Sequence, residues 1–185
     1  MIALTDLARE MGVDTRTMRR AAADGTIRCE RVSPRRQSVS QNEYRYAVGH
    51  WPLLAKLRQM LRTEPNVRLA VLYGSTARGT ETPSSDIDVL VALAEDRPET
   101  AVKLATRLER GLGGAVDVAR LNRVRGRSPL LLLQVIDEGR VVLNRDGLWE
   151  QLRTQRAEIE QQASREHEAL RRRARTSVEE LLATS

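Results

Sequence analysis

A glycine–serine pair and three aspartates are the residues of this chain whose types and spacing could do chemistry. Gly74 and Ser75 follow the apolar run 69–73, and Asp86 and Asp88 stand at the start of a second apolar run. Side chains two apart in a strand share a face, so these two carboxylates repel each other unless a cation lies between them. Oxygen ligands of this kind suit Mg²⁺, which binds through one or two carboxylates together with substrate phosphates. The spacing therefore predicts a site for a metal-bound triphosphate.

A third carboxylate, Asp117, lies in the β-branched run 115–119. If this run is a strand beside the one that begins with Asp86 and Asp88, the three carboxylates converge. Two metal ions about 3.5–4 Å apart could then span the attacking and leaving oxygens of an in-line displacement. Asp117 is expected to bind the second ion and to act as the base for an attacking hydroxyl.

The turn at Gly74 is expected to provide the phosphate contacts. Glycine lets the main chain turn tightly and approach a ligand closely. Ser75 is predicted to cap a short helix that runs through Ala77 and stops at Gly79. Free N–H groups at a helix start favour phosphate oxygens, and the serine hydroxyl can add a contact.

These motifs, Gly-Ser-Thr-Ala-Arg-Gly at 74–79, Ser-Asp-Ile-Asp at 85–88 and Val-Asp-Val at 116–118, resemble the DNA polymerase beta superfamily of nucleotidyltransferases. More narrowly, they resemble its minimal nucleotidyltransferases. The resemblance covers about residues 65–146 and implies an α/β fold, a mixed sheet flanked by helices. It implies that Gly74 and Ser75 hold the β- and γ-phosphates of ATP, that Asp86 and Asp88 bind both Mg²⁺ ions, and that Asp117 binds the catalytic ion. Arg78 matches a frequent family position and is a candidate nucleotide contact.

Residues 1–48 are expected to form a separate DNA-binding domain. A helix over 3–11 and a second helix over 15–23, capped by Asp14, have helix-turn-helix spacing. A hairpin with its turn at 33–36 would form a basic wing, and the stretch resembles the winged domains of MerR and excisionase proteins. The predicted DNA contacts are Arg16, Arg19, Arg20, Arg35 and Arg36. The alternative is a three-helix protein-docking module with an arginine-coated surface.

The rest of the chain is predicted to form a nucleotidyltransferase domain over 49–146 and a helical tail over 147–185. Gly49 to Pro52 is expected to be the joint, with Pro52 in the first turn of a new helix and Trp51 as a packing anchor between domains. Residues 98–112 are predicted to be a crossover helix between two strands of the sheet.

The tail carries a sparse apolar stripe that needs a partner surface, which its own enzyme domain, a second copy or another protein could supply. The second copy would make the protein a homo-oligomer. The stripe consists of Leu148, Leu152, Ile159, Ala163, Leu170, Ala174, Val178 and Leu181.

Composition sets outer limits on the function. The chain has 31 basic and 25 acidic residues, a net charge of +6, which permits contact with nucleic acid. The single cysteine, Cys29, cannot form an internal disulfide and suits a reducing cytoplasm. No stretch reaches the roughly 18 apolar residues of a membrane-spanning helix, and the N-terminal segment does not have the pattern of a secretory signal.

The resemblance therefore predicts a Mg²⁺-dependent enzyme that transfers AMP from ATP to a hydroxyl of a macromolecular acceptor. Minimal nucleotidyltransferases of this kind often act as antitoxins that adenylylate a HEPN-type ribonuclease toxin on tyrosine, and a DNA-binding domain would suit control of their operon. Two alternatives remain open. One is a DNA-binding regulator whose nucleotidyltransferase domain is catalytically silent, and the other is a nucleotidyltransferase toxin that modifies tRNA.

Overall fold

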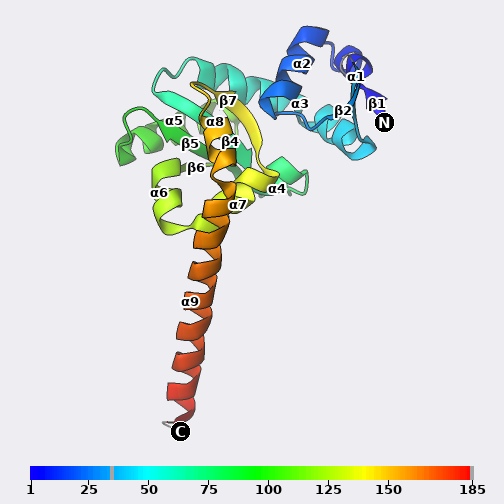
Figure 1. Cartoon of the computed structure of the whole chain (residues 1–185). Coiled ribbons are helices and arrows are strands. Elements are labelled where there is room, and N and C mark those ends of the chain that lie inside the picture. Colours follow the sequence, from blue (N-terminus) through cyan, green and yellow to red (C-terminus); the bar gives the residue numbers. More distant parts are fainter. Residues whose placement is uncertain (34–35, 184–185) are drawn as a thin grey trace.

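The computed structural model describes residues 1–33 and 36–183, without the side chains of residues 32, 33, 36, 170 and 173–183. A small N-terminal module adjoins a sheet domain, and a long C-terminal helix leaves the sheet domain on another side (Figure 1). The predicted α/β class, a mixed sheet flanked by helices, is confirmed. Within the described residues, none of the helices combines the length and the apolar character needed to cross a bilayer.

The central sheet has four strands in the order β6-β5-β4-β7. Strand β4 (Val67–Tyr73) is antiparallel to both β5 (Ile87–Leu93) and β7 (Arg140–Asn144). Strand β6 (Val116–Arg120) is parallel to β5, and the crossover between them is α5 (Pro98–Leu112), as the sequence predicts. A parallel pair needs such a crossover, so the position of Asp117 next to β5 depends on α5.

Helices cover both faces of this sheet. Helix α5 and the long helix α3 (Gln41–Arg62) share one core, to which Ala70 and Leu72 of β4 belong. The opposite face packs against four helices, which are α6 (Leu121–Arg127), α7 (Pro129–Glu138), α8 (Leu148–Thr154) and α9 (Arg156–Ala183). Because both faces are covered, β4 is apolar almost throughout and five successive residues, 69–73, are buried.

The N-terminal module contains α1 (Leu4–Glu10) and α2 (Thr15–Asp24), followed by a hairpin of β2 (Glu30–Ser33) and β3 (Arg36–Val39). Strand β1 (Ile2–Ala3) pairs with β3 and completes a three-stranded sheet. Asp14 caps α2 as expected, since its side chain accepts a hydrogen bond of 2.6 Å from the Arg16 N–H.

Helix α3 contradicts the predicted joint at Gly49–Pro52, because it runs unbroken from Gln41 to Arg62 with Pro52 in its interior. An interior proline costs about 3 kcal/mol, since it removes one helical hydrogen bond. Burial on both sides of the proline offsets this cost: Tyr46 and Ala47 are buried before it, and Leu54, Leu57 and Leu61 after it. The domain boundary at 48/49 remains a prediction, and it falls inside this helix.

A buried ion pair joins the N-terminal module to the sheet domain. Arg140, at the start of β7, donates two hydrogen bonds to the Glu43 carboxylate, at 2.6 and 3.0 Å. The same guanidinium donates to the Ala77 carbonyl at 2.7 Å and lies 3.4 Å from the centre of the Tyr46 ring. Both charged side chains are at most 7% exposed, so the two parts of the chain share a desolvated contact.

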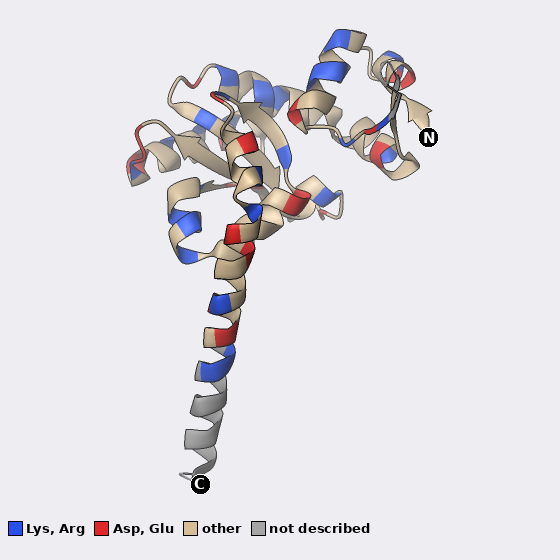
Figure 2. Cartoon of the chain, viewed as in Figure 1, with Lys and Arg blue, Asp and Glu red and all other residues tan. Residues whose placement is uncertain are grey.

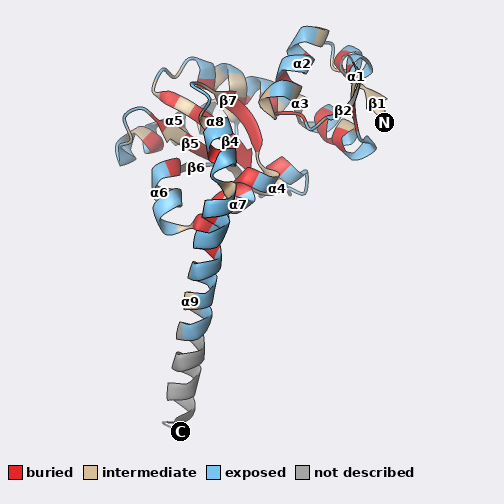
Figure 3. Ribbon diagram, viewed as in Figure 1, coloured by how far each residue is buried: buried red, intermediate tan, exposed pale blue. Residues whose placement is uncertain are grey.

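The C-terminal stripe is partly covered by the chain's own sheet domain. Leu152 and Ile159 are buried in the core that contains α7, and Ala163 is buried as well. Arg156 pairs with Asp137 of α7 at 2.8 and 2.9 Å. Beyond this contact, the described turns of α9 are largely exposed (Figure 3). The stripe residues Leu170, Ala174, Val178 and Leu181 have side chains outside the described ones.

Candidate active site

The three aspartates lie at one end of β5 and β6. Asp88 pairs in register with Asp117 of the parallel strand β6 and with Tyr73 of β4 on its other side. Directly paired residues of neighbouring strands point to the same face, so the two carboxylates lie side by side. Asp86 comes two residues before Asp88, just ahead of β5, which places it at the same end of the sheet.

The charges of Asp86 and Asp117 act on Asp88. The pKa of Asp88 is raised above its ordinary value by burial, then by the negative charges of Asp117 and Asp86, while Arg78 opposes the shift. Burial, followed by the charges of Asp88 and Asp117, raises the pKa of the Tyr73 hydroxyl to about 12. A cation at this end of the sheet would relieve the repulsion, so the site suits a bound metal.

The main chain at Gly74 lies directly against Asp88. Gly74 has φ +72°, and a Cβ atom added to it would lie 2.1 Å from Asp88 Oδ2. Only glycine fits both the backbone angle and the space. The helix α4 (Gly74–Arg78) begins at this glycine, with Tyr73 in the N-cap position and no side-chain cap. The prediction that Ser75 caps the helix is therefore wrong, because the helix starts at Gly74, two residues before the start that a Ser75 cap would give.

The donor set fits a hard divalent cation in part. Every candidate ligand is a carboxylate oxygen, the donor that Mg²⁺ prefers. Within the described part of the chain, no group of three or more Asp, Glu, His or Cys side chains is arranged so that it alone could hold a metal ion. Asp86, Asp88 and Asp117 could thus supply only part of a coordination shell, and nucleotide phosphates would have to complete it.

Arg78, the predicted nucleotide contact, pairs with Glu138 of α7 at 3.1 Å, and both side chains are about two-fifths exposed. Its charge still reaches Asp88, since it lowers the pKa of that carboxyl. Arg78 thus lies within electrostatic range of the carboxylates but is held by a different partner.

Sequence reasoning missed the contacts that hold the loop preceding Asp86 in place. His50 Nε2 lies 2.6 Å from Glu81 Oε1, and the His50 ring stacks on Tyr46 with centroids 4.1 Å apart. The Thr82 N–H donates to Ser85 Oγ at 2.9 Å. His50 is 31 positions from Glu81, so no local spacing could have identified this contact.

The predicted DNA contacts divide into three groups. Arg16 and Arg19 of α2 are exposed and form no ion pair within the described residues, and α2 carries segments coloured blue for Lys and Arg in Figure 2. Arg20 is also exposed but has Asp24 at 3.9 Å. Arg35 lies outside the described residues, as does the side chain of Arg36.

The family follows from comparison with known proteins. Residues 55–148, just over half of the chain, match the family model described as Polymerase beta, Nucleotidyltransferase. The chain therefore belongs to the polymerase beta nucleotidyltransferase family, and it is a nucleotidyltransferase. The matched segment contains the Gly74 turn and all three aspartates. A search of curated protein sequences found no match.

Several solved structures with a similar fold come from toxin–antitoxin systems. One is a toxin–antitoxin with AMP-PNP, at 26% identity and a TM-score of 0.55, covering 65% of this chain and 97% of its own. A mutant of the toxin–antitoxin MntA-HpeT matches at 25% identity and a TM-score of 0.56, with the same coverage. The MNT antitoxin with a tri-AMPylated HEPN toxin from Shewanella oneidensis matches at 24% and 0.53, covering 68% and 98%. That last likeness concerns the fold alone.

Proposed function

We propose that this protein is a Mg²⁺-dependent adenylyltransferase that moves AMP from ATP to a hydroxyl of a protein acceptor. The observation that carries the proposal is the juxtaposition of Asp88 with Asp117 in register and with Gly74, where an added Cβ would lie 2.1 Å from Asp88 Oδ2. Two carboxylates beside a glycine turn are what a metal–triphosphate complex requires, because the phosphates need both a cation and close access to main-chain donors.

The chain's own residues have separate roles in this reaction. The glycine at position 74 lets the phosphates approach the main chain, and Ser75 offers a hydroxyl to them. Asp117 accepts the proton of the attacking hydroxyl as its oxygen bonds to the α-phosphorus of ATP. The bond from the α-phosphorus to the bridging oxygen breaks, and pyrophosphate leaves with the electron pair. Asp86, Asp88 and Asp117 would hold Mg²⁺, which would supply positive charge to neutralise the triphosphate.

A toxin is the acceptor that the comparisons favour. The structural neighbours include a toxin–antitoxin with AMP-PNP, and a HEPN toxin AMPylated in complex with its MNT antitoxin. By this analogy the present chain is an antitoxin that adenylylates a HEPN-type toxin, and a stable complex with that toxin is expected.

The N-terminal module is proposed to bind operator DNA. The support is the order of its elements, two helices and a hairpin, together with the exposed Arg16 and Arg19 on α2. Replacing both arginines with alanine should weaken DNA binding and reduce its salt dependence, as measured by fluorescence anisotropy on the operon's own promoter DNA. Unchanged affinity would favour a protein-docking module instead.

Labelled ATP tests the catalytic proposal. The protein is incubated with Mg²⁺, α-phosphate-labelled ATP, and either the protein encoded by the neighbouring gene or total tRNA. Label should enter the protein encoded by the neighbouring gene, and Asp88→Asn should abolish this labelling. Asp6→Asn, at an exposed position of α1 in the N-terminal module, should not. Label in tRNA would identify a tRNA-modifying toxin. No label in either, with DNA binding retained, would identify a silent regulator.

A further inference from the structure

A cavity of about 310 Å³ opens beside Asp117, on the outer side of β6. Asp117 lines it together with the next residues of β6, and α6 contributes Arg123 and Arg127, with Ser128 just beyond that helix. The cavity is thus next to the carboxylate that would take the acceptor's proton. Strand β5 separates β6 from β4, the strand that ends just before Gly74, so the cavity and Gly74 lie on opposite sides of β5. An in-line reaction needs its acceptor opposite the leaving pyrophosphate, which makes this the side from which an acceptor would arrive.

The cavity has unused positive charge. Arg123 and Arg127 are four residues apart on α6, so their side chains share a face of the helix. Both are exposed, and neither forms an ion pair or a hydrogen bond with any residue that the structure describes. The neighbouring arginines, in contrast, have partners within the chain. Arg120 forms an ion pair with Asp96 at 3.0 Å, and Arg125 donates a hydrogen bond to Gln155 at 2.7 Å. Figure 2 shows this basic character on α6.

The strand and the side chains that line the cavity suit a polypeptide better than RNA. In the described sheet β6 is an edge strand, and the cavity follows its consecutive residues 117–120. An edge strand offers unpaired main-chain groups to an extended peptide. The lining contains no aromatic side chain, whereas single-stranded nucleic acids are usually held by bases stacked on aromatic rings.

We infer that this cavity is the acceptor site and that it takes an acidic polypeptide segment. The hydroxyl-bearing side chain of the segment enters beside Asp117, and acidic residues flanking it pair with Arg123 and Arg127. The inference rests on the proposed adenylyl transfer, in which the hydroxyl oxygen bonds to the α-phosphorus, its proton passes to Asp117 and pyrophosphate departs. It adds a charge requirement on the acceptor that the reaction itself does not impose.

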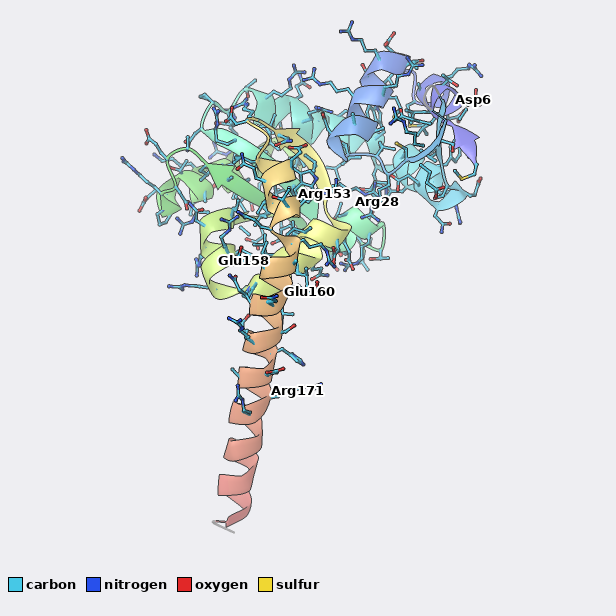
Figure 4. The ribbon with its side chains drawn as sticks, in the orientation of Figure 1. Asp6, Arg28, Arg153, Glu158, Glu160 and Arg171 are labelled. Atoms are coloured by element: carbon cyan, nitrogen blue, oxygen red, sulfur yellow. The ribbon has the colours of Figure 1, made fainter. Side chains whose placement is uncertain are left out.

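A binding measurement tests the charge requirement without relying on catalysis. The probes are fluorescent random copolymers of glutamate with tyrosine and of lysine with tyrosine, titrated with the full chain, Mg²⁺ and AMP-PNP. The glutamate copolymer should bind more tightly than the lysine copolymer. The double substitution Arg123→Glu/Arg127→Glu should weaken the affinity for the glutamate copolymer by about tenfold or more, because two attractions become two repulsions. The control is Arg110→Glu/Arg153→Glu, which makes the same change in net charge at two exposed arginines of α5 and α8 (Arg153 is labelled in Figure 4).

Transfer of labelled AMP separates this inference from the proposed function. The wild-type chain should label the glutamate copolymer in preference to the lysine copolymer, and the charge-reversed variant should invert that preference. Equal binding of both copolymers, or equal losses in the variant and its control, would overturn the inference while leaving adenylyl transfer intact. Labelling of tRNA in place of either copolymer would overturn it as well. Binding that depends on Arg123 and Arg127, without transfer to any acceptor, would overturn the proposed function but uphold the acidic-segment surface.

Discussion

At the residue scale, Asp88 is the most constrained group of the active site. The carboxylates of Asp86 and Asp117 act on it electrostatically, and the main chain of Gly74 lies against its Oδ2 atom. Both constraints follow from strand register, which no single residue determines. The alternation of Asp86 and Asp88 could be predicted from sequence, whereas the contact with Gly74 depends on the pairing of Tyr73 with Asp88.

Replacing Gly74 with alanine tests the contact with Asp88, and a second glycine with positive φ serves as the control for the loss of stability that the backbone angle causes. The new Cβ would displace the Asp88 carboxylate, so transfer should fall by about 100-fold. The positive φ adds a loss of about 1–2 kcal/mol in unfolding free energy. The control is Gly113→Ala, at φ +79° with nothing within 4 Å, which should lose similar stability but keep its activity. Equal activity of the two variants would contradict the assigned contact.

The titration of Asp88 provides a second test at this scale. In the metal-free protein its pKa should lie above the ordinary 3.8, because burial and two neighbouring carboxylates disfavour the charged form. A raised folded-state pKa means that the stability contributed by Asp88 is fully present below its unfolded-state pKa and is lost as the pH rises through the folded-state value. Carbon-13 NMR of the carboxyl should show a lower pKa in Asp117→Asn, and an identical titration would show that Asp117 does not act on Asp88.

At the scale of elements, α9 is fixed by its first turns. Ile159 is 4% exposed in the core beneath α7, while the Arg156–Asp137 pair lies at the surface with both side chains about two-fifths exposed. The apolar contact should therefore dominate, since exposed ion pairs add little to stability.

Urea unfolding of two variants can compare these contributions. Ile159→Ala should lower the free energy of unfolding by about 2–5 kcal/mol, since it leaves a cavity in the core. Arg156→Ala should have a much smaller effect. If the arginine variant lost as much stability as the isoleucine variant, the ion pair would be the principal anchor of α9.

The same scale shows what the sequence could predict. Strands β4 and β5 are largely apolar runs, and α2 lies between a capping Asp14 and a left-handed Gly25, so each of these elements carries its own signal. The continuity of α3 has no such local signal, because Gly49 and Pro52 favour a break. Only burial against two neighbouring parts of the fold keeps the helix unbroken. Sequence reasoning also missed α6, because an arginine-rich segment with few apolar residues has a weak helical pattern.

At the scale of the whole molecule, Glu43 and Arg140 hold the N-terminal module to the catalytic domain. They are 97 positions apart, so local spacing could not reveal them. Arg28, labelled in Figure 4, adds a hydrogen bond from the N-terminal module to the Glu138 carbonyl of α7. Since Arg140 also donates a hydrogen bond to the Ala77 carbonyl, the anchor extends to α4, the helix that begins at Gly74.

Glu43→Gln should test how strongly this anchor stabilises the fold. Loss of the carboxylate leaves the buried Arg140 charge unpaired, which should cost about 3–5 kcal/mol in unfolding free energy measured with urea. The matched control is Glu138→Gln, which removes the exposed partner of Arg78 and should cost less than about 1 kcal/mol. Similar losses in both variants would mean that the buried pair contributes no more than a surface pair.

The central claim is that three aspartates and a glycine turn together hold a metal-bound nucleotide. Anomalous X-ray diffraction from crystals grown with AMP-PNP and Mn²⁺, which shares the oxygen ligands of Mg²⁺, tests it most directly. The account predicts a manganese peak between the carboxylates of Asp88 and Asp117, with the triphosphate against Gly74 and Ser75. Manganese or nucleotide bound only at a distance from these residues would contradict it.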